Sequence, residues 1–305
     1  MDYVNEARAL AEAHGIKVSL EDQPGYFLRQ VWGALPGDSL PGLVVETSFY
    51  HEEDQTWKPT VAPAWVWAKD AQAGQISASL TWAKAVNRAV HPIPGRGGVF
   101  WHGAGRKPEK ILSPLAKKGT RGGLDDLTWV GAFWCDLDCA SHGYTLTQGL
   151  EVLLKLPLKP SFVVFSGGGL QAVHVLSEPW SVGNYAAALE YKDYSLALYR
   201  ETFQQSGLVL DESVHEAARM MRLPGFVNQK PSRGGAEARI IYEDPEARYS
   251  LSAIVAVAGD RVRARVSDAP SDVGVSATSE RTGENPQNPN PTGIYAVTRH
   301  FVAHL

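Results

Sequence analysis

Apolar and polar positions follow one another along the chain in short runs that predict strands and helices in alternation. Residues 3–14 have the spacing of an amphipathic helix, with Asp2 placed to cap its start and Gly15 placed to end it. Runs rich in Val, Phe and Trp are typical of strands. Five such runs occur, at residues 43–47, 97–101, 128–138, 161–165 and 170–176.

Further helices are expected between and after these strands. Thr145 and Gln148 have the spacing of a capping box ahead of an apolar helix face. Residues 184–206 are the longest helical candidate, and residues 213–221 form a short one. Strands and helices at this spacing predict a layered, mixed fold of the α+β (mixed α/β) class.

The composition changes sharply near residue 268. Residues 268–293 are rich in Pro, Ser and Asn and contain no aromatic side chain, which is typical of a flexible linker. We therefore expect one folded domain over residues 1–267, followed by the linker. The last segment, 294–305, is either a frayed terminus or the start of a further region.

Composition and charge exclude several classes of protein. Of the 305 residues, 44% are hydrophobic, enough for a sizeable core, and the net charge of −4 excludes a uniformly basic nucleic-acid-binding surface. Basic residues nevertheless gather in two segments, 103–123 and 214–239, which are either solvated loops or parts of a basic groove. No signal peptide or long apolar run occurs, so we expect a cytoplasmic protein without a membrane partner.

Paired carboxylates follow the third predicted strand, in the sequence FWCDLD. Asp136 and Asp138 are two residues apart, so in a strand their side chains point to the same face. Two like charges this close are unfavourable unless a cation lies between them, and oxygen ligands suit Mg²⁺ or Mn²⁺. The alternative is an ordinary acidic pair on the surface.

A glycine-rich turn, Ser166 to Gly169, separates the next two predicted strands. Its glycines allow close backbone approach, and backbone N–H groups in such a turn can bind phosphate oxygens. Without further support, an ordinary hairpin is the simpler interpretation. Beyond the turn, Gln171 and His174 fall on opposite faces of the strand.

The third group of polar residues runs from Asp211 to Lys230. Asp211 or Ser213 suits the cap of a short helix, which is its simple structural role. Further on come Arg222, Asn228 and Lys230, which are donors suited to phosphate groups. Three carboxylates can hold two divalent ions, and the turn with its basic residues can hold a triphosphate. Together the groups indicate two-metal nucleotidyl transfer.

These motifs, in this order, resemble the archaeo-eukaryotic primase superfamily, and within it the primase-polymerases of plasmids and phages. That family has a hydrophobic strand ending in Asp-x-Asp and a Ser-Gly-x-Gly-x-His hairpin. An Asp then leads through a helix to Arg-x-Pro-Gly-x-x-Asn-x-Lys. Here the motifs read WCDLD, SGGGLQ and DESVHEAARMMRLPGFVNQK, and the resemblance covers residues 95–260.

The resemblance implies a primase core, with a catalytic sheet like that of an RNA-recognition motif and an N-terminal α/β unit. It implies a DNA-dependent primase-polymerase that makes primers on single-stranded DNA from NTPs or dNTPs, with a replicative helicase as a partner in cis or in trans. Two Mg²⁺ or Mn²⁺ ions would be held by the catalytic residues Asp136, Asp138 and Asp211. The nucleotide would be bound by Ser166, Gly167, Gly168, Gln171, Arg222, Asn228 and Lys230.

The sequence departs from this pattern at one position, because Gln171 stands where the family has His. An amide can still donate a hydrogen bond to a phosphate, so we assign the phosphate-binding role to Gln171 rather than to His174. The departure also leaves open a catalytically weak replication initiator or single-stranded-DNA-binding protein of the same fold. A metal-dependent glycosyltransferase, which also uses Asp-x-Asp, is a further alternative that does not explain the third motif.

Two other features have both a functional and a structural interpretation. Cys135, Cys139 and His142 invite a zinc site, although i and i+4 on a strand lie about 13 Å apart, so buried thiols are the better interpretation. Trp101 and Trp129 are available to stack on template bases near the basic segment 103–123, with core packing as the alternative, favoured for Trp129.

Overall fold

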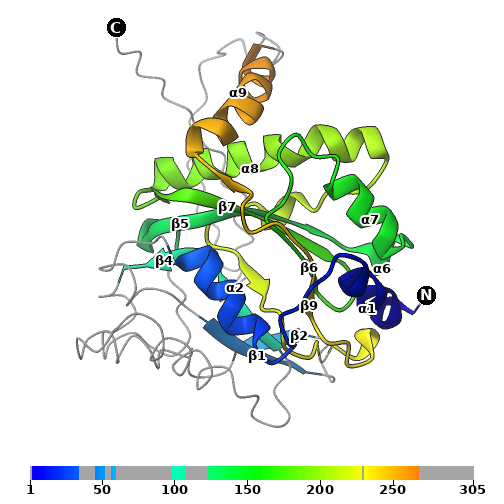
Figure 1. Ribbon diagram of the computed structural model, residues 1–305. Coiled ribbons are helices and arrows are strands. Elements are labelled where there is room, and N and C mark those ends of the chain that lie inside the picture. Colours follow the sequence, from blue (N-terminus) through cyan, green and yellow to red (C-terminus); the bar gives the residue numbers. More distant parts are fainter. Residues whose placement is uncertain are drawn as a thin grey trace, which may run out of the picture. The chain divides into compact units, whose positions relative to one another are not determined.

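The computed structural model describes residues 2–33, 45–51, 56–59, 98–107, 123–228 and 230–267 (Figure 1). The chain divides into two units, residues 1–267 and 268–305. The predicted linker and the C-terminal segment lie outside the described residues, as do residues 108–122 of the first basic segment. Within the described ranges, no helix has the length and apolar character needed to cross a bilayer.

The larger of two sheets carries the first two motifs. Its strands pair antiparallel in the order β4 (Ala104–Arg106), β5 (Leu127–Leu137), β7 (Leu170–Ser181), β6 (Phe162–Phe165) and β9 (Arg239–Glu243). A short strand, β10 (Arg248–Tyr249), pairs parallel with β7. The strand β6 and the first half of β7 are buried, which explains why their sequences are apolar runs rather than alternating patterns.

A smaller antiparallel sheet has the order β2 (Thr56–Pro59), β1 (Val45–His51), β3 (Gly98–His102) and β8 (Met220–Arg222). The strand β8 belongs to the third motif and lies more than a hundred residues from β3 in the sequence. Its pairing places Arg222 opposite Phe100. The third motif therefore supplies an edge strand of the smaller sheet.

The predicted helix over residues 213–221 is wrong. The structure has one 3-10 turn, η3 (Glu212–Val214), then irregular backbone, then β8. Val214, His215 and Ala217 are buried in this segment. Hydrogen bonds between β8 and β3 satisfy backbone groups that a helix would satisfy internally, so tertiary pairing outweighs local helix propensity here.

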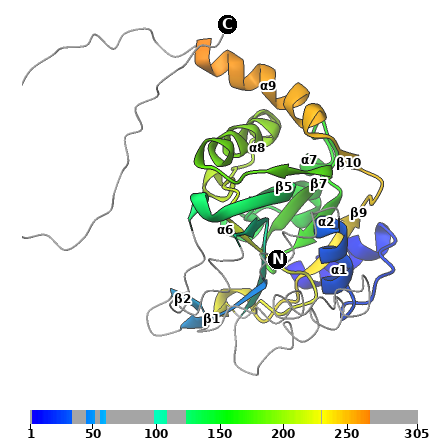
Figure 2. The same ribbon diagram turned by 90° about the vertical axis from the view of Figure 1, so that its left-hand side faces the viewer.

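Helices cover both faces of the larger sheet (Figure 1). One face carries α7 (Leu146–Leu153) and α8 (Tyr185–Ser206), and the other carries α2 (Gln23–Trp32). The helix α1 (Tyr3–Ala13) lies beside β9, and α9 (Leu251–Ser267) contacts α8 after the chain leaves β10 (Figure 2). The short helix α6 (Cys139–His142) follows β5 directly. This arrangement confirms the α+β class.

The remaining sequence-based elements are confirmed with shifted ends. The cap of α1 is Asp2, whose side chain accepts a hydrogen bond from the backbone N–H of Asn5. The capping box of Thr145 and Gln148 is present at the start of α7. The strand β7 runs to Ser181, five residues beyond its predicted end, because it also pairs with the first half of β5.

Candidate functional site

A cavity of about 310 Å³ lies where the two sheets meet. The larger sheet contributes Asp136 and Gln171 to its wall, and the smaller sheet contributes Phe100 and residues 220–222. The volume is at the lower end of the range of small-ligand sites. Of the residues proposed from the sequence, those that line it are Asp136, Asp138, Ser166, Gly168, Gln171, Arg222, Asn228 and Lys230.

The two carboxylates of the first motif both line this cavity, as their spacing predicts. Asp136 lies on β5 opposite Gln171 of β7. Asp138 follows the strand and caps α6, so its position is fixed by the start of a helix.

Asp136 has unfavourable surroundings for a negative charge. Burial and the neighbouring Asp138 and Asp211 raise its pKa to about 7 from the ordinary 3.8. Arg219 and Arg222 act in the opposite direction without offsetting the rise. A cation beside Asp136 would remove this imbalance.

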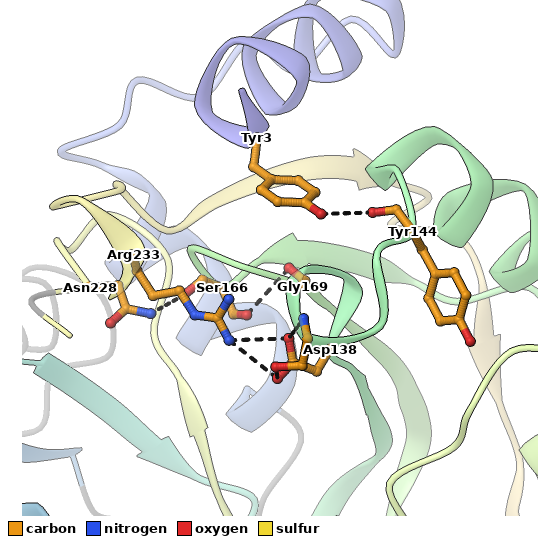
Figure 3. Close-up of polar contacts among 8 residues, drawn as sticks. Tyr3, Asp138, Tyr144, Ser166, Gly169, Asn228 and Arg233 are labelled. Carbon is orange, nitrogen blue, oxygen red and sulfur yellow. Dashed lines mark hydrogen bonds and ion pairs between the residues drawn. The ribbon is translucent and has the colours of Figure 1, made fainter. Parts of the chain in front are cut away.

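Asp138 is already fully hydrogen-bonded to the protein (Figure 3). Its Oδ1 accepts from the Ser141 backbone N–H at 3.1 Å, and its Oδ2 accepts from the Ser141 hydroxyl at 2.6 Å. Arg233 Nη2 lies 3.1 Å and 3.2 Å from the two oxygens. Burial raises the pKa of Asp138, but the bonds from Ser141 and Arg233 outweigh it and hold the pKa below its ordinary value.

Asp211 does not line the cavity. It is exposed and caps η3, with its Oδ1 accepting hydrogen bonds from the backbone N–H and the hydroxyl of Ser213 at 2.9 Å and 2.6 Å. It is near enough to contribute to the raised pKa of Asp136. The capping role considered from the sequence is confirmed, and its role as a metal ligand stays a prediction.

The glycine-rich hairpin is shaped by three different close contacts. Gly167 has a φ of +103°, and a Cβ atom added there would lie 2.7 Å from the Cβ atom of Asn228. At Gly168 the neighbour is the guanidinium of Arg233, 2.5 Å away. At Gly169 it is the backbone carbonyl oxygen of Leu137, 2.1 Å away. Gly167 itself does not line the cavity.

The third motif is joined to this hairpin through Asn228. Its side-chain Nδ2 donates to the backbone carbonyl of Ser166 at 2.8 Å (Figure 3), and its Oδ1 accepts from the backbone N–H of Lys230 at 3.1 Å. Asn228 therefore links the hairpin to the backbone of Lys230, and all three line the cavity.

The amide of Gln171 has a defined orientation. Its Oε1 accepts a hydrogen bond from the backbone N–H of Arg222 at 3.0 Å, which joins the two sheets. Since the acceptor end is occupied, the amide nitrogen Nε2 is the atom left for a ligand, and it has no partner among the described residues.

His174 lies on the opposite face of β7, as strand alternation predicts. Its Nδ1 lies 2.8 Å from the Tyr199 hydroxyl and its Nε2 lies 2.9 Å from the Leu158 carbonyl oxygen. Complete burial lowers its pKa to about 4. It is a hydrogen-bonded core histidine outside the cavity.

Four basic side chains from the second basic segment line the cavity: Arg219, Arg222, Lys230 and Arg233. Arg222 is 7% exposed, and its guanidinium lies 4.6 Å from the centroid of the Phe100 ring. Burial lowers the pKa of Arg222 to about 10, although Asp136 opposes this shift. The sequence-based site list omitted Arg219, although it belongs to the third group of polar residues and was a candidate donor for phosphate. The list also omitted Arg233, whose place in the basic segment 214–239 was the available signal.

Two of the alternatives raised by the sequence do not fit the structure. Trp101 is 1% exposed and packs edge-to-face against Phe27 and Trp134, so it cannot stack on a template base. Cys135 and Cys139 are buried free thiols, as the simpler interpretation predicts. Trp129 is partly buried against the core.

The donor chemistry of the cavity fits a hard divalent cation. Carboxylate oxygens are the preferred ligands of Mg²⁺ and Mn²⁺, and Arg219 and Arg222 do not fully offset the burial and negative neighbours of Asp136. In the part of the chain that the structure describes, no three His, Cys, Asp or Glu side chains are grouped closely enough to hold a metal ion. Asp138 is bonded to Ser141 and Arg233, and Asp211 is bonded to Ser213.

Comparison with known proteins gives structural similarities only. No family model matches the sequence, and no curated protein matches it. The primase-polymerase AEP domain of cyanophage S-2L is similar at 17% identity and a TM-score of 0.47, covering 78% of this chain and 97% of that one.

Two further solved structures are similar. The catalytic domain of primase RepB' in complex with initiator DNA has 13% identity and a TM-score of 0.39, covering 81% of this chain and 99% of that one. The polymerase domain of Mycobacterium tuberculosis ligase D in complex with DNA has 15% identity and a TM-score of 0.35, covering 84% and 100%. All three are primase or polymerase domains by description, but similarities this distant establish neither the activity nor the substrates of this chain.

Proposed function

We propose that the chain is a DNA-dependent primase-polymerase, which makes primers on single-stranded DNA by two-metal nucleotidyl transfer in plasmid or phage replication and can extend them. One observation carries the proposal: a single cavity brings the Asp136–Asp138 pair together with the glycine-rich hairpin and the basic residues of the third motif.

The distribution of charge in the cavity suits a nucleoside triphosphate accompanied by divalent cations. Asp136 and Asp138 line the cavity where β5 ends, Arg222 and Lys230 come from the third motif, and Arg233 follows that motif closely in the sequence. A site for phosphate alone has no use for paired carboxylates, and a site for a metal alone has no use for several basic side chains. A substrate that is an anion and a metal ligand at once accounts for both.

Asp136 and Asp138 would hold the cations, with Asp211 as the third carboxylate. When bound, such ions lower the pKa of the attacking hydroxyl and stabilise the charge on the leaving phosphate. Ser141 orients Asp138 by two hydrogen bonds, while a cation at this carboxylate would replace its contact with Arg233. With a pKa of about 7, Asp136 is only partly ionised near neutral pH in the metal-free protein. A bound cation would favour the ionised carboxylate.

The remaining residues would bind and orient the triphosphate. Gln171 lines the cavity and would offer its amide nitrogen to the phosphates, because its oxygen is held by the Arg222 N–H. Arg222 and Lys230 supply positive charge near the phosphates, while Asn228 fixes the hairpin beside them. These roles need no histidine, so the departure from the family pattern at Gln171 is compatible with nucleotide binding.

A non-catalytic replication initiator or single-stranded-DNA-binding protein is the second candidate. One observation favours it: both oxygens of Asp138 are bonded to protein groups. The two candidates differ in their response to divalent cations, because an initiator without catalysis has no need to exchange these bonds for a metal.

The proposal is tested by incubating the protein with a homopolymeric single-stranded DNA template, Mn²⁺ or Mg²⁺, and each NTP or dNTP in turn. The expected product is an oligonucleotide that contains only the nucleotide complementary to the template. Folded protein that binds Mn²⁺ and the template but makes no product with any nucleotide would contradict the proposal and favour the initiator.

A further inference from the structure

Arg233 is a hydrogen-bond and ion-pair partner of Asp138 that comes from a distant part of the sequence. Its Nη2 lies within 3.2 Å of both carboxylate oxygens of Asp138. Arg233 is 95 residues from Asp138 in the sequence, whereas Ser141 is only three residues away. The Arg233 side chain is 14% exposed and the Asp138 side chain is 40% exposed. The guanidinium thus lines the cavity and is held at the oxygens that a cation would need.

The path of the Arg233 side chain depends on Gly168. A Cβ atom at that position would lie 2.5 Å from the guanidinium carbon and 2.5 Å from Nη1, so the guanidinium crosses directly over the glycine. The backbone of Arg233 is fixed independently, because its N–H donates to the Lys230 carbonyl at 2.8 Å and its carbonyl accepts from the Ala236 N–H at 3.1 Å. Movement of the side chain alone would release Asp138.

Two further positive charges lie in the surroundings of Arg233. Arg222 and Lys230 line the same cavity, and the charge of Arg233 contributes to lowering the pKa of Arg222. Turned away from Asp138, the guanidinium would join these like charges, which is favourable only when an anion lies among them. The two positions therefore suit two different states of the cavity.

We propose that Arg233 is a displaceable counter-ion: it neutralises Asp138 in the metal-free protein, and gives up that place to a divalent cation when it turns to the phosphates of the nucleotide. The inference rests on the proposed function. Ser141 keeps its two hydrogen bonds to Asp138 throughout, so the carboxylate stays in place while its partner changes. Metal and nucleotide then favour each other's binding, and by linkage the effect is the same in both directions.

The test is Mn²⁺ binding, measured by electron paramagnetic resonance at about pH 8 with and without a non-hydrolysable nucleoside triphosphate. Arg233→Ala removes the competitor, so Mn²⁺ alone should bind about twofold to fivefold more tightly than to the wild type, the worth of one partly exposed ion pair. The triphosphate should bind more weakly to the variant, and should tighten Mn²⁺ binding by a smaller factor than in the wild type.

Two further variants separate the contact from a loss of charge. Arg8→Ala removes an arginine that pairs at 3.9 Å with Glu237 on the surface, and Mn²⁺ affinity should not change. Gly168→Ala keeps the Arg233 charge but forces its guanidinium off Asp138, so it should tighten Mn²⁺ binding as Arg233→Ala does. Thermal melting of each variant shows whether it is folded.

The outcomes distinguish this inference from the proposed function. If the wild type binds Mn²⁺ and neither Arg233→Ala nor Gly168→Ala binds it more tightly, the displaceable counter-ion is wrong and the metal site stands. If neither the wild type nor any variant binds Mn²⁺, with or without triphosphate, the displaceable counter-ion and the proposed two-metal function are both wrong. Mn²⁺ binding by Arg233→Ala, with none by the wild type in the absence of triphosphate, would also support the inference, because it would show that Arg233 blocks the site.

Discussion

Gln171 shows how a single hydrogen bond defines what a side chain can offer a ligand. The Arg222 N–H occupies its oxygen, so only the amide nitrogen is left to act, and only as a donor. We expect Gln171→Ala to weaken triphosphate binding by about 0.5–1.5 kcal/mol, the usual worth of one hydrogen bond. Nucleotide affinity measured by calorimetry tests this.

His174→Ala is the matched control on the same strand. His174 contacts Tyr199 and the Leu158 carbonyl on the other face, so its loss should lower the free energy of unfolding and leave nucleotide affinity unchanged. If His174→Ala lost affinity while Gln171→Ala kept it, the assignment of the phosphate-binding role would be reversed.

Asp136 makes the metal-free protein sensitive to pH. Its pKa is about 7 in the folded state and 3.8 ordinarily, so between these values the folded state binds more protons than the unfolded state. The contribution of Asp136 to the free energy of unfolding therefore decreases as pH rises from about 4 to about 7. Denaturant unfolding without divalent ions, at intervals across this range, should show a smaller decrease for Asp136→Asn than for the wild type. An identical pH dependence in the two proteins would show that the carboxyl is not strained by its surroundings.

At the scale of elements, the hairpin between β6 and β7 is held from two sides. Gly169 lies against the backbone of β5, and Gly168 lies against a side chain. Backbone cannot move aside as a side-chain end can, so Gly169→Ala should lower the free energy of unfolding by about 1–3 kcal/mol, as overpacking does. Gly168→Ala should cost clearly less in the same denaturant experiment. Equal losses would mean that the hairpin as a whole does not tolerate a methyl group.

The elements that the sequence predicts well are those whose signals are local. The caps Asp2 and Thr145 and the apolar strand β6 depend on neighbours a few residues away. The strand β8 could not be predicted from local signals, because its pairing partner β3 is remote in the sequence and its own residues have helix propensity. A single sequence carries no signal for such a pairing.

The same distinction holds within the site. Asp136 and Asp138 both line the cavity, as their spacing predicts, although Asp138 lies just beyond the end of β5 and caps α6. The contact of Arg233 with Asp138, like the burial of Trp101, depends on how distant segments pack. Local pattern therefore identified the chemical groups, while their partners had to come from the three-dimensional structure.

At the scale of the whole molecule, all described parts of the cavity belong to the unit of residues 1–267. The composition of residues 268–293 is too polar to bury enough apolar surface to offset the entropy of ordering. We expect a chain that ends at residue 267 to keep the melting temperature and the primer synthesis of the full chain. Loss of either in the shortened chain would show that the C-terminal residues dock on the domain.

The most direct test of the central claim is primer synthesis by Asp136→Asn beside the wild type, with the melting temperature of both metal-free proteins measured at about pH 8. The claim is that the Asp136 carboxylate binds a divalent cation needed for nucleotidyl transfer, and that it lowers the stability of the metal-free protein. It predicts that the variant makes no primer and melts at the same temperature as the wild type or above it, because a crowded charge has been removed. A folded Asp136→Asn protein that makes primers at the wild-type rate would contradict the account.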